Sequence, residues 1–242
     1  MRQCSVYPAS PKTTRPVFVL LGLAAWCIVA GDTAWGGTLK GTVRYTGAAV
    51  EPKKLPVTVD HSVCGKEKDA EDIVLSQEKG IRNVVVSLQS PPPGATWPVS
   101  LPVVQLDQQQ CVYVPRVVVV PVGGTVEFLN TDRLLHNLHS ASTGNPTFNR
   151  TQPRGRTIPI VFTKPEIVRV DCDLHPWMRA WVVVAEHPFY AVTNDQGNFV
   201  LDNVPPGAYT LQLWHESLGA MTQDVTVKDE AITAVTVEMS KK

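Results

Sequence analysis

The sequence has no excess of charge of either sign and lacks the motifs of several common enzyme classes. Its 242 residues include 22 Lys and Arg against 22 Asp and Glu, so no strong field favours nucleic acid or an anionic membrane as a partner. It contains no Cys-x-x-Cys-His haem-attachment motif and no Gly-rich nucleotide loop. We therefore expect neither a haem protein nor a nucleotide-dependent enzyme.

Helical periodicity is also missing from most of the chain. Beyond the N-terminal region no stretch shows sustained apolar spacing of 3.6 residues, whereas short β-branched runs bounded by Gly, Pro, Asn and Asp recur. These runs predict strands over residues 38–45, 83–88, 116–122, 125–129, 158–162, 167–172, 180–185, 209–214 and 233–238. The length allows two domains, and the spacing predicts an all-β fold of sandwiches or barrels.

Only one long apolar run occurs, at residues 17–30, after the basic residues Arg2, Lys12 and Arg15. The run is shorter than the ~20 residues that span a bilayer and ends in small residues, which is typical of a secretory signal peptide. We predict a signal peptide over residues 1–36, cleaved near residue 31 or 36; an uncleaved anchor is the alternative. The mature protein would then be periplasmic or secreted and not bound to a membrane.

Cysteine is scarce, and export changes how it is interpreted. Of the five cysteines, Cys4 and Cys27 would leave with the signal peptide, so Cys64, Cys111 and Cys172 remain in an oxidising compartment. The most economical arrangement is a disulfide between Cys64 and Cys111 that staples two domains, with the Cys172 thiol kept from oxidation by another role. A simple leftover thiol is the alternative.

The segment Cys172-Asp-Leu-His175-Pro-Trp-Met178 lies between two β-branched runs and carries the strongest chemical signal. A thiolate, an imidazole and a thioether on one short loop are soft and borderline ligands, and two histidines, a cysteine and a distant methionine form the blue-copper ligand set. Singly, each of these residues is more often structural. The second imidazole would come from His136 or His139, whose side chains point to opposite faces of an extended segment; the Asn that follows favours His136.

The region from about residue 110 to 184 resembles the plastocyanin and amicyanin type of cupredoxin. The resemblance is carried by Tyr113-Val-Pro115, the turn Gly123-Gly-Thr-Val, Asn130, the pair His136-Asn137 and the Cys-x₂-His-x₂-Met spacing. It implies a Greek-key sandwich that holds one copper ion through His136, Cys172, His175 and Met178, with Asn137 linking the two ligand loops. It also implies that His175 reaches the surface as the electron port, with Pro176 and Trp177 beside it; a packed aromatic is the alternative for Trp177.

The flanking segments resemble the carboxypeptidase regulatory-like, or transthyretin-like, sandwich. The similar segments are Gly41-Thr-Val-Arg-Tyr, Asn83-Val-Val-Val-Ser-Leu and the stretch from Val192 to Leu211. About a hundred residues separate the second segment from the third. The resemblance thus implies an inserted domain: residues 37–94 and 188–242 form the flanking sandwich, and residues 95–187 form the copper domain.

This ligand set predicts a one-electron carrier and not an enzyme, because protein ligands fill all four coordination positions and leave none for substrate. The expected partner is a redox protein that docks weakly and briefly. Two alternatives remain. The same side chains could serve periplasmic copper storage or delivery, or the chain could be a metal-free binding module.

Overall fold

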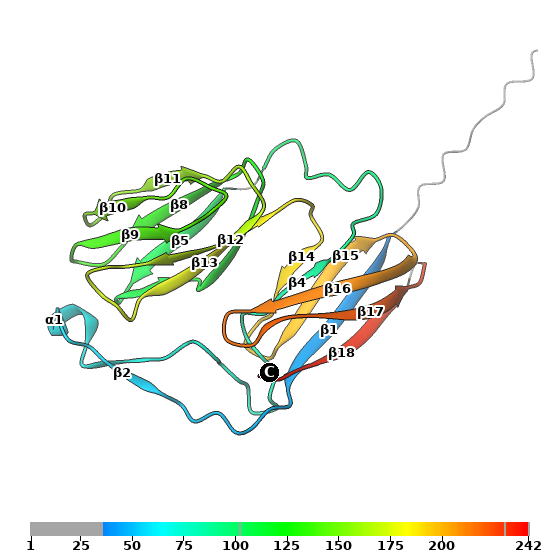
Figure 1. Cartoon of the computed structure of the whole chain (residues 1–242), viewed down its shortest axis with the longest axis horizontal. Helices are drawn as coiled ribbons and strands as arrows, with labels where there is room; N and C mark the ends of the chain where they lie inside the picture. The colour runs from blue at the N-terminus through cyan, green and yellow to red at the C-terminus, as the bar shows by residue number, and fades with distance from the viewer. Residues whose placement is uncertain (1–35, 102, 230, 242) are drawn as a thin grey trace, which may run out of the picture. The chain divides into compact units, whose positions relative to one another are not determined.

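The structure is a computed structural model that describes residues 36–101, 103–229 and 231–241 (Figure 1). In chain order the elements are β1 (Gly37–Tyr45), β2 (Lys54–Pro56), α1 (His61–Cys64), β3 (Glu67–Asp69), β4 (Val85–Leu88), β5 (Val104–Gln109), β6 (Val112–Val114), β7 (Val117–Pro121), β8 (Thr125–Asn130), β9 (His136–Ala141), β10 (Asn149–Gln152), β11 (Ile158–Val161), β12 (Glu166–Asp171), β13 (Arg179–Ala185), β14 (Tyr190–Val192), β15 (Asn198–Val204), β16 (Gly207–His215), β17 (Gly219–Val227) and β18 (Ile232–Met239). The predicted all-β class is confirmed.

The predicted signal peptide, except for its last residue, lies outside the described residues. Within the part of the chain that the structure describes, no helix has the length and apolar character that a membrane crossing requires.

The central sandwich consists of a five-stranded sheet, in the order β10-β9-β12-β13-β7, and a four-stranded sheet, in the order β11-β8-β5-β6. Strand neighbours are often non-consecutive, as Greek-key connections require. Alternate residues of β8 point inward, so that Val126 and Phe128 are buried while Thr125 and Glu127 are not. Together with Leu106, Leu138 and Phe162 they form the core between the two sheets.

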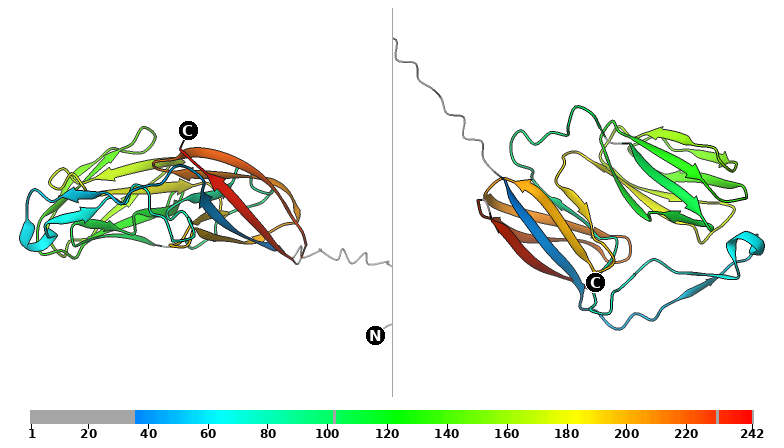
Figure 2. Two further views of the ribbon diagram at one scale, coloured as in Figure 1. Left: turned by 90° about the horizontal axis from the view of Figure 1, so that it is seen from below. Right: turned by 180° about the vertical axis from the view of Figure 1, so that it is seen from behind.

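The flanking sandwich is built from the two ends of the described chain. Its sheets have the orders β15-β1-β18 and β14-β4-β16-β17, and β1 lies parallel to β18 with Val43 opposite Val237 (Figure 2). Because β4 and β14 are neighbours in one sheet, the chain leaves this sandwich after β4 and returns to it at β14. Leu39, Val43, Phe199 and Leu213 are part of its core.

One turn of this sandwich depends on a glycine. The hairpin before β15 closes with a hydrogen bond from Gly197 N–H to the Asn194 carbonyl at 2.9 Å, and Gly197 has a positive φ of 77°. A Cβ atom there would lie 2.6 Å from the Val43 carbonyl oxygen, so both the conformation and the space require glycine.

Residues 57–66, which we call the strap, lie between β1 and β4 in the chain but pack on the central sandwich. The strap contains α1, and its ends meet where Val57 N–H donates to the Lys66 carbonyl at 3.0 Å. Val57 and Cys64 are buried in the central core. The predicted disulfide is present and joins Cys64 to Cys111, with their Cα atoms 5.3 Å apart. The strap is therefore covalently fixed to the sandwich that carries His136 and Cys172.

Candidate metal centre

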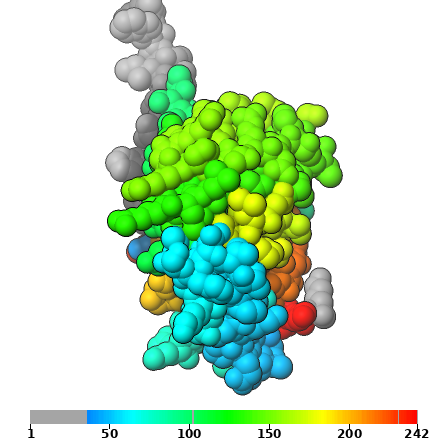
Figure 3. Space-filling model, turned by 90° about the vertical axis from the view of Figure 1, so that its left-hand side faces the viewer, coloured from blue at the N-terminus to red at the C-terminus, as the bar shows by residue number. Residues whose placement is uncertain are grey.

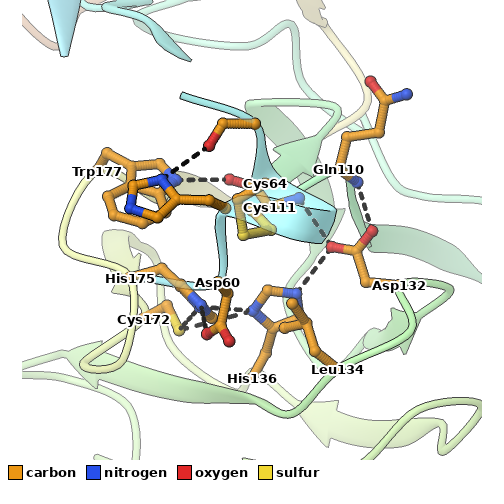
Figure 4. Close-up of a disulfide and its surroundings, with 12 residues drawn as sticks. Asp60, Cys64, Gln110, Cys111, Asp132, Leu134, His136, Cys172, His175 and Trp177 are labelled. Carbon is orange, nitrogen blue, oxygen red and sulfur yellow. Dashed lines mark hydrogen bonds and ion pairs between the residues drawn. A yellow bond between two sulfur atoms is a disulfide. The ribbon is translucent and has the colours of Figure 1, made fainter. Parts of the chain in front are cut away.

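The sheet that contains β9, β12 and β13 brings the predicted ligand loops together. His136 is the first residue of β9, Cys172 directly follows β12, and His175 and Met178 lie in the loop that leads to β13. Strands β9 and β12 are paired, with His139 opposite Asp171. This pairing places two segments about 36 residues apart in the chain at one end of the sheet (Figure 4).

Three ligand atoms of this cluster converge on a common point. The Nδ1 atoms of His136 and His175 are 3.0 Å apart, and the Sγ atom of Cys172 lies 3.9 Å from the first and 3.6 Å from the second. His136 and His175 are 0% exposed and Cys172 is 1% exposed. These three residues form what we call the ligand triad.

The spacing of the ligand triad fits a transition-metal ion. An ion about 2.0 Å from each imidazole nitrogen and about 2.3 Å from a thiolate sulfur requires ligand atoms roughly 3 to 4 Å apart, and all three measured separations lie in this range. Two other triads of close potential ligands include Cys111. Its sulfur is in the disulfide and cannot serve as a thiolate. Among the described residues, Cys172 is the one free cysteine.

Both imidazoles are oriented by a carboxylate on the side away from the triad. His136 Nε2 lies 2.8 Å from Asp132 Oδ2, and His175 Nε2 lies 3.0 Å from Asp60 Oδ2. A carboxylate only accepts hydrogen bonds, so each Nε2 carries the proton that it donates. In a neutral ring Nδ1 then has a lone pair, and both lone pairs point toward the Cys172 sulfur. Two lone pairs 3.0 Å apart repel each other unless a proton or a cation lies between them.

The titration of the two histidines differs in direction. Burial lowers the pKa of His136, but its hydrogen bonds with Asp132 and Cys172 outweigh burial and raise this pKa above its ordinary value. Burial lowers the pKa of His175 and outweighs the hydrogen bond with Asp60. A cation bound between the two Nδ1 atoms would displace any proton held there.

Asp132 is held in its charged form by donors. Burial would raise its pKa, but hydrogen bonds from His136 and from the backbone N–H groups of Cys111 and Gln110 lower it on balance. The two backbone donors lie 2.8 and 2.5 Å from its carboxylate oxygens. The charge that orients His136 is thus stabilised by backbone donors of the turn between β5 and β6.

Asn137 and Tyr113 connect the two ligand segments. Asn137 accepts a hydrogen bond from Asp173 N–H at 2.5 Å and donates to the Asp173 carboxylate at 3.1 Å, which is the linking role that the resemblance implies. The Tyr113 hydroxyl contacts the carbonyls of Asn137 and Asp171 at 3.0 and 3.2 Å. These contacts fix β9 and the end of β12 relative to each other.

The structure separates the other candidate residues. Met178 is 1% exposed in the central core, and its N–H donates to the His175 carbonyl at 2.9 Å, so it lies directly beside the triad in the chain. His139 points to the opposite face of β9, where its half-exposed side chain contacts Asp173 at 2.8 Å. Only His136 of this pair belongs to the triad.

His175 is not at the surface, and the expectation that it forms an exposed electron port is wrong in this respect. It is 0% exposed, because Asp60 of the strap covers its Nε2 edge and the Trp177 ring lies 5.3 Å from its own ring. Trp177 is half-buried and donates to the Cys111 carbonyl at 2.9 Å. Pro176 is exposed.

Sequence reasoning missed the two carboxylates, Asp60 and Asp132, that contact the Nε2 atoms of the triad histidines. Nothing in the pattern around Asp60 or Asp132 distinguishes them from ordinary loop carboxylates. Cys64 is the one indication in the sequence, since a disulfide from Cys64 to Cys111 places the strap beside the turn between β5 and β6.

Comparisons with known proteins give partial matches. The family described as polysaccharide lyase family 4, domain II matches residues 175–235, which is well under half of the chain. It is not the family that the flanks resemble, so the carboxypeptidase regulatory-like resemblance stays a prediction. No curated protein matches the chain.

Among solved structures, the chain is similar to cupredoxins. The copper-containing nitrite reductase from Thermus scotoductus is 25% identical with a TM-score of 0.34, over 41% of this chain and 26% of that chain. A purple cupredoxin from Nitrosopumilus maritimus is 26% identical with a TM-score of 0.30, over 34% of this chain and 99% of that one. An amicyanin variant in the reduced Cu(I) form is 24% identical with a TM-score of 0.33, over 41% and 98%. The chain thus spans about a quarter of the nitrite reductase. Because these TM-scores are low, the similarity supports no argument about the chemistry of the site.

Proposed function

We propose that this protein is an exported copper protein of the cupredoxin type that carries single electrons. The observation that supports the proposal most directly is the convergence of two imidazole nitrogens and a free thiol, 3.0 to 3.9 Å apart, in a site with almost no exposed surface. A buried thiol with two nitrogens at these separations is a ligand set for copper or zinc. The order Cys172, His175, Met178 favours copper, because the thioether is a soft ligand.

Copper bound in this site would alternate between its +1 and +2 states and so supply one-electron transfer. His136, Cys172 and His175 would bind it. Asp132 and Asp60 hold the Nε2 proton of each imidazole, so that the same nitrogen always points inward. Burial of the triad, at 0 to 1% exposure of its three residues, keeps water away from it. Ligands fixed in this way change position little between the two charge states, which is what rapid electron exchange requires.

We assign the fourth ligand position to Met178 and infer that the protein is not an enzyme. Met178 is buried in the same core as Cys172, and the backbone of the two residues is joined by a hydrogen bond from Cys172 N–H to the Met178 carbonyl at 3.4 Å. With four protein ligands and a water-excluding core, no position remains for substrate or water.

The proposed partner is a redox protein that docks weakly. Leu135 and Leu174, which directly precede the two imidazole ligands, are 45% and 46% exposed. Pro176, which directly follows His175 in the chain, is also exposed. Exposed apolar residues next to the ligands in sequence would suit a brief encounter. Export to an oxidising compartment agrees with the disulfide, and the flanks would serve as a carboxypeptidase regulatory-like scaffold.

The test is to add Cu(II) to the purified metal-free protein and record visible absorption and electron paramagnetic resonance. We expect one copper ion per chain and an intense thiolate-to-copper band, which Cys172→Ser abolishes. His136→Gln should lose the band, whereas the matched variant His139→Gln should keep it, because His139 points away from the triad.

Two results would contradict the proposal in different ways. An ordinary tetragonal copper signal that is the same in wild type and Cys172→Ser would exclude the thiolate site. A thiolate band that is lost within seconds to a Cu(I) chelator after reduction would indicate copper delivery, the alternative use of the same side chains, instead of electron transfer.

A further inference from the structure

The Nε2 edge of His175 is covered by a residue that comes from outside the central sandwich in sequence. Asp60 lies 115 positions before His175, and its Oδ2 atom is 3.0 Å from His175 Nε2. The Asp60 side chain is 52% exposed while that of His175 is 0% exposed. Asp60 therefore lies between solvent and the triad, and Figure 4 shows its carboxylate beside His175.

The strap holds Asp60 in this position from both sides. Asp60 has a left-handed conformation with φ 54°, and its carbonyl accepts hydrogen bonds from the N–H groups of Val63 and Cys64 at 3.0 and 2.9 Å. Cys64 is in turn bonded to Cys111. On the other side, the buried Val57 anchors the strap in the central core. Figure 3 shows the strap region, in cyan, against the green and yellow strands of the central sandwich.

The two imidazoles of the triad are thus oriented by carboxylates of different origin. Asp132 is four residues from His136, is buried, and accepts two backbone hydrogen bonds besides the one from the imidazole. Asp60 is half-exposed, and its carboxylate has no other hydrogen-bond partner among the described residues than His175. A carboxylate behind a metal-binding histidine fixes the tautomer of the ring and raises the basicity of the nitrogen that faces the metal.

We propose that Asp60 is a positioning residue for the metal centre: it keeps the proton of His175 on Nε2 so that Nδ1 faces Cys172, and its charge favours the more oxidised form of the bound ion. The effect of the Asp60 charge on a bound ion rests on the proposed function. The effect of Asp60 on the His175 tautomer concerns the metal-free chain alone.

The two parts require different properties of the side chain. The tautomer needs only an acceptor near Nε2, which an amide oxygen also provides. The effect on the bound ion needs the negative charge. Asp60→Asn and Asp60→Ala therefore separate the two roles. Glu67→Gln is the matched control, because it removes one negative charge at the neighbouring β3, where Glu67 pairs only with exposed Lys54 at 3.7 Å.

The first measurement uses the metal-free protein at pH 8. Nitrogen-15 NMR of the histidine rings reports which nitrogen of His175 carries the proton. We expect the Nε2–H form in wild type, Asp60→Asn and Glu67→Gln, and a mixture of both forms in Asp60→Ala. A wild-type spectrum for Asp60→Ala would overturn the proposal.

The second measurement uses the copper-loaded protein. We expect Asp60→Ala to lose about 10-fold to 100-fold in Cu(II) affinity, the range for residues behind a metal ligand. Asp60→Asn should keep its thiolate band but be reduced more easily than wild type and Glu67→Gln. An unchanged reduction potential in Asp60→Asn would overturn the charge effect. If wild type bound no copper, the proposed function would fail, while the tautomer measurement would still decide the role of Asp60.

Discussion

Removal of the disulfide should destabilise the central sandwich and release the strap. Cys64 and Cys111 are 47 residues apart in sequence, and closing a loop of that length costs the unfolded chain about 4 kcal/mol of conformational entropy in the loop-closure model. Measured values are often lower than this limit, so we expect Cys64→Ala/Cys111→Ala to lose about 2 to 4 kcal/mol. Both cysteines are buried, and alanine leaves no unpaired polar group in their place.

Native-state hydrogen exchange measures this loss of stability separately in the central core and in the strap. Amides such as those of Phe128 in β8 and Val170 in β12 lie in the central core and report the unfolding of that sandwich. Val63 N–H and Cys64 N–H, which donate to the Asp60 carbonyl, report the opening of the strap. We expect strap protection to fall more than core protection. A core loss below about 1 kcal/mol, or a strap that stays fully protected, would refute this reasoning, and Cys172→Ala serves as the control that leaves the disulfide in place.

Three further predictions concern the scaffold around the site. Burial raises the pKa of Glu166, but hydrogen bonds from Ser142 and its neighbours outweigh burial and lower this pKa to about 2. Glu166 should therefore contribute stability above about pH 4.5 that is lost as the pH falls toward 2. In urea unfolding, Glu166→Gln should cost about 1 to 2 kcal/mol at pH 7 and almost nothing at pH 2. Tyr113→Phe should cost about 1 to 2 kcal/mol, because two carbonyls lose their donor; equal stability would contradict that role. Gly197→Ala should lower the thermal midpoint of the flanking sandwich, since its Cβ would meet the Val43 carbonyl at 2.6 Å.

The strands that sequence predicts well are those with β-branched runs. The strands expected over residues 116–122, 167–172 and 180–185 correspond to β7, β12 and β13 within one or two residues. Their inward residues are mostly valines, which fit a half-buried pleated surface. Alternate faces of an extended segment predict that only one of His136 and His139 reaches the site, and the Asn that follows favours His136; in the structure His136 is buried and His139 is exposed.

Strands without such runs were not predicted. β9 begins His-Asn-Leu-His, and β17 carries Thr222, Gln223 and Asp224, all of which are exposed. Their hydrogen-bonded neighbours determine them: β10 and β12 pair with β9, and β16 pairs with β17 along its whole length. Tertiary pairing of this kind is not encoded in a local apolar pattern.

The strap shows the same limit at the metal site. Its residues 57–66 have no apolar period, and only Cys64 indicates that they pack far from β1 and β4. Asp60 therefore could not be recognised as a contact of His175, and the exposure of His175 was predicted from the central domain alone. The cupredoxin resemblance is limited to residues 110–184, so it cannot predict that the strap, which lies outside that region, shields His175 from solvent.

The origins of the two carboxylates have a consequence for how the site responds to perturbation. Asp132 is fixed by backbone donors on the β5–β6 turn, so that the orientation of His136 depends on the sandwich itself. Asp60 is fixed by α1 and the disulfide, so that the orientation of His175 depends on the strap. Loss of the disulfide should consequently disturb the His175 tautomer and leave that of His136 unchanged. A change in both rings would mean that the strap stabilises the whole ligand end of the sandwich and not one histidine.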